Sequence, residues 1–389
     1  MLGPIVLLLA MDPAADPDLG RPLDTPAIPA ADLSSGGTPR AAGTPEILYI
    51  NFDGGVLQTG CGNDPHYDCS TLAGLFDGYV GPFEGNLNQR IAILQATRKD
   101  VKDFGVRVVV DRPPEDVDYT MVMYGDLGPQ SFAGIAPYID CEDRRGGDTS
   151  FTQGFGGSNT GSTVILQEAA HTWGLEHVDA EFDILNPFKA AGLNQFFNDE
   201  CFRIVANTDL EPTPGVCNQV HTQFCETGYQ NSWREMYLMF GPAVPDTTTP
   251  TLEITSPADG SSFVLPTTIA LLGDIEDDLD PQFYGLQIYD GDQLIFDDTR
   301  VALDLLLINP PEGDYDLRVV LTDEAGNATE DTVSFTVLPE GSELPPEPEE
   351  DDPSEPAQTG CRSGGAPPSP TSLLLLLPLL GLRLRRRAR

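Results

Sequence analysis

The chain of 389 residues is poor in basic residues: 21 lysines and arginines stand against 61 aspartates and glutamates, which gives a formal net charge of −40. This charge repels the phosphate backbone of nucleic acids, so we expect no nucleic-acid partner. Histidine is also scarce, with four residues in the whole chain, so a regular group of histidines is informative. Hydrophobic residues make up 40% of the sequence, which is enough for packed cores and excludes a wholly disordered chain.

Long apolar runs are absent as well. Residues 2–10 form a short apolar run like the core of a signal peptide, although a basic start and a clean cleavage site are missing. The apolar run at residues 373–382 is too short to cross a bilayer as a helix, and an arginine cluster follows it. Both ends therefore predict export. We assign the terminal segments as a candidate signal peptide at 1–20, a flexible leader at 21–44, an acidic proline-rich linker at 339–360 and a sorting or anchor segment at 361–389.

No Cys-X-X-Cys pair occurs among the seven cysteines, which disfavours a zinc–thiolate cluster. Six of them lie in one stretch of the chain, whereas Cys361 stands alone near the C-terminus. On a chain with export signals this pattern predicts up to three disulfides in an oxidising compartment. The pairs Cys61–Cys69 and Cys217–Cys225 are close enough in sequence for local bridges, but the connectivity stays open. The six candidates are Cys61, Cys69, Cys141, Cys201, Cys217 and Cys225.

Residues 45–243 show the elements of a helix-and-sheet domain. Alternating apolar residues predict strands at 47–53, 106–110 and 119–124. Apolar residues near a 3.6-residue period predict a helix at 85–104, which Gly105 ends. A glycine-, serine- and threonine-rich loop is expected at 144–163, followed by a second helix at 163–172. Together these elements predict helices packed on a mixed sheet.

Residues 247–338 have a different texture, with short alternating runs separated by turn signals such as Asp-Gly and Ala-Gly-Asn. This spacing predicts an all-β sandwich, with strands at 251–254, 268–272, 285–289, 317–321 and 332–337. The runs at 254–260 and 313–327 resemble bacterial Ig-like repeats, and that resemblance implies a spacer or adhesion unit. Acidic clusters at 274–280 and 290–292 could hold Ca²⁺, but neither fits an EF-hand, and a solvated acidic loop is the favoured interpretation.

The chemistry of the first domain is concentrated in the segment Gln-Glu-Ala-Ala-His-Thr-Trp-Gly-Leu-Glu-His, which begins at Gln167. Gln167 and His171 are one helical turn apart, so a helix places both on one face, where they can bind one metal ion. Glu168 lies beside them, off the coordination axis, in a place suited to a general base. Gly174 is expected to end the helix and turn the chain back, which brings in His177 as a further ligand.

This segment resembles the extended zinc motif of the metzincin metallopeptidases, HExxHxxGxxH, with glutamine in place of the first histidine. Over residues 45–243 the resemblance consists of the order of strands and helices, and individual residues match only within the motif. It implies an α+β zincin-like (metzincin) catalytic domain, one zinc ion, and hydrolysis of peptide bonds in a protein or peptide substrate. It also implies an edge strand that binds substrate by strand addition, placed here at 132–137, and a methionine-containing turn below the metal, for which Met236 is the candidate.

The third metal ligand stays open, because Gln167 offers an amide oxygen, whereas zinc prefers nitrogen and sulfur donors. Three arrangements are compatible with the sequence. In the first, Gln167 binds the metal weakly. In the second, Asp179, His221 or His66 completes the site. In the third, the metal has been lost.

The C-terminal tail resembles a bacterial sorting signal of the myxobacterial type, built here from Cys361, a Gly/Pro/Ser spacer, a leucine run and arginines. That resemblance implies that Cys361 is processed and attaches the protein to the cell envelope; an ordinary tail anchor would also end at a membrane. The sequence thus predicts an exported, surface-attached zinc metalloendopeptidase. The alternative is a catalytically inactive binding or adhesion module on the same fold.

Overall fold

The computed structural model describes residues 45–155, 157–188, 194–279 and 281–344. The predicted signal peptide, leader and sorting segment with Cys361 lie outside these residues, as does the linker after residue 344. Within the described ranges no helix is long and apolar enough to cross a membrane.

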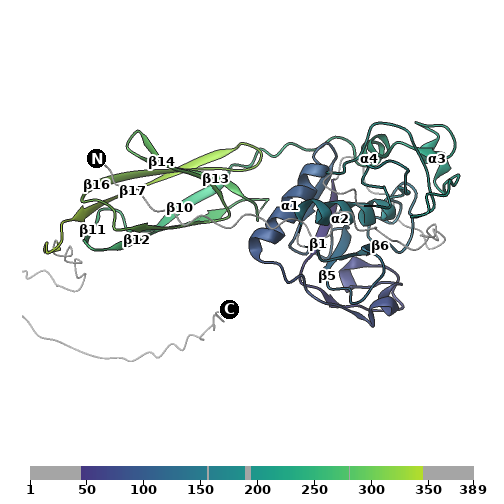
Figure 1. The fold of residues 1–389 in the computed structure, drawn as a ribbon, viewed down its shortest axis with the longest axis horizontal. Helices are drawn as coiled ribbons and strands as arrows, with labels where there is room; N and C mark the ends of the chain where they lie inside the picture. The colour runs from purple at the N-terminus through teal and green to yellow at the C-terminus, as the bar shows by residue number, and fades with distance from the viewer. Residues whose placement is uncertain (1–44, 156, 189–193, 280, 345–389) are drawn as a thin grey trace, which may run out of the picture. The chain divides into compact units, whose positions relative to one another are not determined.

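The first part of the chain is built on a five-stranded mixed sheet in the order β4-β1-β5-β7-β6 (Figure 1). Four strands run parallel, and the short edge strand β6 pairs antiparallel with β7. The sheet therefore has the mixed character that the sequence predicts, with its edge strand inside the expected segment 132–137. The strands are β1 (Glu46–Asn51), β4 (Val106–Val109), β5 (Thr120–Gly125), β6 (Gly134–Ile135) and β7 (Thr149–Gln153).

The sheet carries a hydrophobic core on each face. On strand β1, Leu48 belongs to one core and Tyr49 to the other, as strand alternation requires. Helices α1 (Leu87–Asp100) and α2 (Ser158–Thr172) pack on the first face. Residues of β2 (Gly55–Val56), the short 3₁₀ helices η2 (Pro65–Tyr67) and η3 (Ala73–Phe76), and β3 (Tyr79–Val80) lie in the segment that covers the second.

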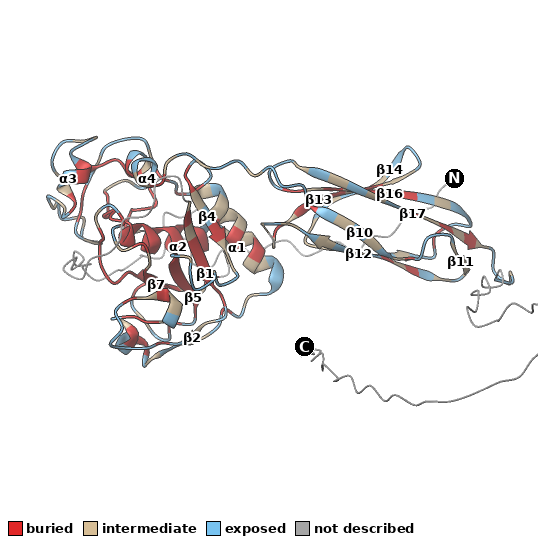
Figure 2. Ribbon diagram, turned by 180° about the vertical axis from the view of Figure 1, so that it is seen from behind, coloured by how far each residue is buried: buried red, intermediate tan, exposed pale blue. Residues whose placement is uncertain are grey.

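Helix α2 begins earlier than the sequence predicts, which corrects the loop expected at 144–163. That stretch forms strand β7 and the first turn of α2. A Cβ atom at Gly161 would lie 2.7 Å from the hydroxyl of Tyr124 and 3.2 Å from Ile93, so the small residues of this turn let α2 approach the sheet and α1 closely. This close packing overrides the low helix propensity of the turn. From Thr160 onward every residue of the helix is buried (Figure 2).

The described residues between α2 and the second part of the chain contain little regular structure, and two disulfides, Cys141–Cys217 and Cys201–Cys225, anchor them. Their elements are β8 (Phe202–Arg203), α3 (Asn218–His221), β9 (Tyr229–Gln230) and α4 (Ser232–Phe240). The three disulfides of the described residues are Cys61–Cys69, Cys141–Cys217 and Cys201–Cys225. Three disulfides indicate that the protein folds in an oxidising compartment, outside the cytosol.

Of the two pairs that the sequence allows as local bridges, Cys61–Cys69 is formed and Cys217–Cys225 is not, because Cys217 pairs with Cys141 and Cys225 with Cys201. Helical hydrogen bonds run from Cys217, the N-cap of α3, through His221 to the backbone N–H of Cys225. At helical rise the two cysteines lie roughly 12 Å apart, beyond the distance of about 7 Å that a disulfide can bridge.

The second part of the chain is a sandwich of two sheets, which confirms the all-β expectation. The three-stranded sheet has the order β10-β12-β15 and the five-stranded sheet the order β11-β17-β16-β13-β14. Strands β11, β14 and β15 are additional to those predicted. The bounds are β10 (Thr251–Ser256), β11 (Ser261–Val264), β12 (Thr268–Glu276), β13 (Tyr284–Asp290), β14 (Gln293–Arg300), β15 (Leu303–Ile308), β16 (Gly313–Thr322) and β17 (Ala328–Leu338).

Candidate metal centre

The turn that follows helix α2 has the hydrogen bonds of a Schellman motif. The backbone N–H of Gly174 donates to the carbonyl of His171, and that of Leu175 donates to the carbonyl of Ala170. Gly174 has a φ of +105°, and a Cβ atom there would lie 2.8 Å from the carbonyl oxygen of Asp140. Only glycine fits this backbone and this space. The chain then reverses and carries His177 back to the helix, as the sequence predicts.

His171 and His177 meet through their Nε2 atoms, which lie 3.1 Å apart. Nδ1 of His171 lies 2.8 Å from the carbonyl oxygen of Leu175, and Nδ1 of His177 lies 3.4 Å from that of Ala206. A carbonyl oxygen only accepts, so each Nδ1 carries a proton and each Nε2 presents a lone pair. Burial and the neighbouring His177 lower the pKa of His171 well below its usual value, and burial lowers the pKa of His177 to about 4. Both imidazoles are therefore neutral near pH 7.

This pair fits a shared metal ion. Bonds of about 2.0–2.1 Å at a tetrahedral angle place two zinc-bound nitrogens about 3.3 Å apart, close to the separation seen between His171 and His177. Metal binding requires the neutral form of imidazole, which burial already favours here. Without a cation, two lone pairs face each other across this short distance.

Two further residues of the motif, Gln167 and Glu168, present oxygen atoms without a hydrogen-bond partner among the described residues. The side-chain nitrogen of Gln167 donates to the carbonyl of Asn186 at 2.8 Å, which leaves Oε1 as the free amide atom. Oε1 of Gln167 and both carboxylate oxygens of Glu168 are buried and accept no hydrogen bond from the described residues. Buried polar atoms rarely remain unpaired, so these orphaned oxygens indicate that a ligand or ordered water belongs there.

Glu168 lies directly under the edge strand. A Cβ atom at Gly134 of β6 would lie 2.5 Å from its Oε1, so glycine at this position makes room for the carboxylate. Burial raises the pKa of Glu168 well above its usual value. A bound cation would favour the ionised form and oppose this shift.

The other residues considered as third ligands have other partners. Asp179 forms an ion pair with Arg203. His66 bonds to Asp64 and to the carbonyl of Val117, and it lines a separate polar cavity of about 240 Å³. His221 is held by two glutamates. Among the described residues, neither of the two groups of three or more histidine, cysteine, aspartate or glutamate ligand atoms includes His171 or His177.

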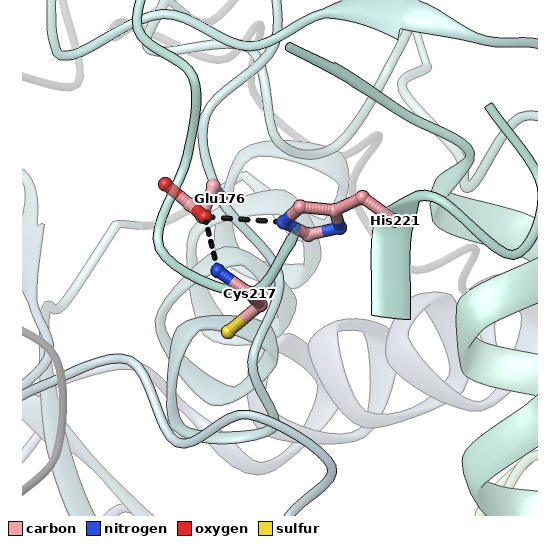
Figure 3. A group of neighbouring side chains, drawn as sticks. All are labelled: Glu176, Cys217 and His221. Carbon is pink, nitrogen blue, oxygen red and sulfur yellow. Dashed lines mark hydrogen bonds and ion pairs between the residues drawn. The ribbon is translucent and has the colours of Figure 1, made fainter. Parts of the chain in front are cut away.

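One of these groups comprises Glu176, Cys217 and His221 (Figure 3). The sulfur of Cys217 is bonded to Cys141, so it offers no thiolate to a metal. His221 lies between Glu176 and Glu235, at 3.1 and 2.9 Å. Burial by itself would lower its pKa, but the hydrogen bonds to these carboxylates outweigh that effect and raise the pKa to about 9. Glu176 and His221 of this group form a buried ion triad with Glu235. The sequence motif does not reveal this triad, because its members are far apart in the chain.

The remaining predictions concern Met236 and the acidic clusters. Met236 is fully buried in the core with Trp173, and it lies in helix α4 rather than in a turn; a place below a metal ion stays a prediction for it. Asn231 caps that helix, and the following run continues it. From the predicted calcium cluster, Asp277 and Asp278 gather with Asp246 at the second group. Calcium binding there stays a prediction.

No family model matches the sequence, and no curated protein does. Among solved structures, the chain is similar to the fibronectin(III)-like modules of CbhA from Clostridium thermocellum, with 24% identity and a TM-score of 0.21 over 23% of this chain and 96% of that one. The PKD1 domain of Epp from Vibrio anguillarum is 14% identical, with a TM-score of 0.18 over 24% of this chain and 98% of that one. The PKD1 domain of the metalloprotease PrtV from Vibrio cholerae is 12% identical, with a TM-score of 0.17 over 24% and 99%. At these values the similarities assign no function to the chain.

Proposed function

We propose that the chain is an exported, zinc-dependent metalloendopeptidase of metzincin type, attached to the cell envelope by its C-terminal segment. The observation that supports this most strongly is the pair of neutral histidines, whose Nε2 atoms converge at 3.1 Å, in the same motif as the buried Glu168, which accepts no hydrogen bond from the described residues. A buried glutamate without hydrogen bonds stays ionised only if a cation is close.

His171, His177 and Gln167 would hold the metal. Gln167 is the third ligand because its amide nitrogen is already engaged by Asn186 and its oxygen is unpaired. Asp179, His66 and His221 are each committed to other partners. Zinc accepts oxygen donors, although it prefers nitrogen and sulfur, so this set binds zinc more weakly than three histidines would.

A zinc ion held by these residues would supply Lewis-acid polarisation of the scissile carbonyl and activation of water. Glu168 accepts the proton of the attacking water and then delivers it to the leaving amine. Its position under β6 puts the base beside the edge strand, where an extended peptide can add as a further strand. Gly134 leaves the space that this carboxylate needs.

A second candidate is a binding module without peptidase activity, and one observation favours it. The side chains of Gln167, Glu168 and His171 are fully buried, and the edge-strand segment 132–137 is buried as well. A peptide reaches Glu168 only if the residues covering it move. In such a module the metal would be structural.

Two measurements on the full chain, purified with its disulfides intact, separate these functions: its zinc content and its ability to hydrolyse peptides. About one zinc ion per chain with chelator-sensitive peptide hydrolysis supports the peptidase. Zinc without hydrolysis supports the binding module. No zinc after incubation with an excess of the metal would contradict both the metal site and the peptidase.

A further inference from the structure

The turn that carries His177 is held from outside the motif through Glu176. Oε1 of Glu176 accepts hydrogen bonds from the backbone N–H groups of Val216 and Cys217 and lies 3.1 Å from Nε2 of His221 (Figure 3). The backbone of Glu176 also exchanges two hydrogen bonds with the side-chain amide of Gln230. The residue directly before the second histidine of the pair is thus fixed through both its side chain and its backbone.

His221 extends this contact to another helix. It is the last residue of α3, and its Nδ1 lies 2.9 Å from Oε2 of Glu235 on α4. Each ring nitrogen therefore faces a carboxylate, and both donate. The motif turn, α3 and α4 are joined by one buried ion network.

The disulfide Cys141–Cys217 closes the same region covalently. On one side, the backbone of Cys217 donates to Glu176. On the other, the Cα atom of Cys141 would lie 2.9 Å from a Cβ placed at Gly174. The disulfide therefore ties the segment packed behind Gly174 to the segment that holds Glu176, and the turn 174–177 is enclosed between them.

We propose that Glu176 and the Cys141–Cys217 disulfide form a positioning clamp for the metal centre. The clamp sets His177 at the distance from His171 that a shared metal ion needs. This inference rests on the proposed function in one respect, that the two histidines bind a metal. Its physical basis is preorganisation: His177 follows the end of α2 and has no helix to orient it, so neighbouring groups must hold it before a metal binds.

Two double variants of the full chain test the clamp, with Co²⁺ as the probe. Cys141→Ser with Cys217→Ser removes the clamp disulfide, and Cys61→Ser with Cys69→Ser removes a disulfide remote from the motif as a matched control. We expect the first variant to bind Co²⁺ at least about tenfold more weakly and to change the visible absorption spectrum of the bound ion. The control keeps the affinity and spectrum of the unmodified chain. Equal effects of the two variants, or no effect of the first, would overturn the clamp.

The same variants distinguish failure of the clamp from failure of the proposed function. If the unmodified chain binds no Co²⁺, the metal site is wrong, and amide hydrogen exchange in residues 175–178 then decides about the clamp. We expect faster exchange there in the Cys141/Cys217 variant alone. Unchanged exchange would contradict the clamp whatever the metal does.

A milder pair of substitutions tests Glu176 itself. Glu176→Gln keeps an oxygen that accepts from Val216 and Cys217 but removes the charge that faces His221, whereas Glu176→Ala removes both. We expect the alanine variant to lose Co²⁺ affinity and the native spectrum, and the glutamine variant to recover most of both. A Glu176→Ala protein with native affinity and spectrum shows that Glu176 does not position the site.

Discussion

His221 and the pair His171–His177 are buried in the same domain, but their pKa values shift in opposite directions. His221 has a carboxylate at each ring nitrogen, and these contacts raise its pKa to about 9 against the effect of burial. His171 and His177 contact each other and backbone carbonyls, and burial lowers the pKa of His177 to about 4. His221 and its two glutamates form a buried ion network within the fold. His171 and His177 are a pair of neutral imidazoles, and it is this pair that we propose as metal ligands.

The difference shows that the partners of a buried histidine, and not its burial, indicate its role. A buried histidine held between carboxylates stabilises the folded chain as a cation, whereas burial keeps the pair His171 and His177 neutral. The same contrast holds for the glutamates. Glu176 and Glu235 are hydrogen-bonded to His221, and Glu168 has no hydrogen bond from the described residues.

The largest expected effect tests whether the uncompensated glutamate is a catalytic base. Glu168→Gln should reduce peptide hydrolysis by roughly 10³-fold, because the amide cannot accept the proton of water. Zinc content and the free energy of unfolding should not fall, since no hydrogen bond is lost. Peptidase assays with metal analysis check this, and hydrolysis at the unmodified rate would remove Glu168 from the mechanism.

The next effect compares the two histidine groups directly. His221→Gln should lower the free energy of unfolding by about 3 kcal/mol, because it leaves two buried carboxylates without their cation. His171→Gln in metal-free protein should cost much less, because His171 bears no charge that a partner compensates. Urea unfolding of both variants after chelation measures the difference. Equal losses would show that the two groups do not differ in this way.

The charge of His221 also predicts a pH dependence of stability. Its pKa in the folded chain, about 9, lies above the ordinary value of 6.5, so the folded state binds the proton more tightly. The stabilisation is complete below pH 6.5 and is lost as the pH rises through 9, and it is on the order of 3 kcal/mol. Urea midpoints from pH 6 to pH 10 should show this loss, and the His221→Gln variant should lack it. A loss of the same size in that variant would assign the effect to other groups.

The smallest expected effect concerns the third ligand. Gln167→His should tighten zinc binding by about tenfold or more, because imidazole nitrogen is a better donor than an amide oxygen. Gln195 provides a matched control, since it is also fully buried with an unpartnered Oε1. Gln195→His should leave zinc affinity unchanged. If Gln167→His brings no gain in a competition titration, Gln167 does not face the metal.

The sequence predicts those features of the site that follow local rules. The spacing from Gln167 to His177 places a helix, a glycine turn and a returning histidine, and the structure contains all three. Backbone sterics at Gly174 and helix periodicity act over a few residues, so they can be recognised without the fold.

Features that depend on distant partners could not be predicted in this way. His221 is 45 residues from Glu176 and 14 from Glu235, and no spacing rule links them. The sequence predicts too late a start for α2, because close packing at Gly161 outweighs the low helix propensity of the first turn. The pairing of Cys141 with Cys217 across a separation of 76 residues likewise depends on the completed fold.

That disulfide also gives the chain a covalent ring. Residues 141–217 are closed by one sulfur–sulfur bond, and the ring contains strand β7, helix α2 and the turn at Gly174. A foreign protease that cuts the backbone once within this ring releases no fragment, because both new ends remain attached through the bridge. A single nick would therefore leave His171 and His177 on one connected molecule.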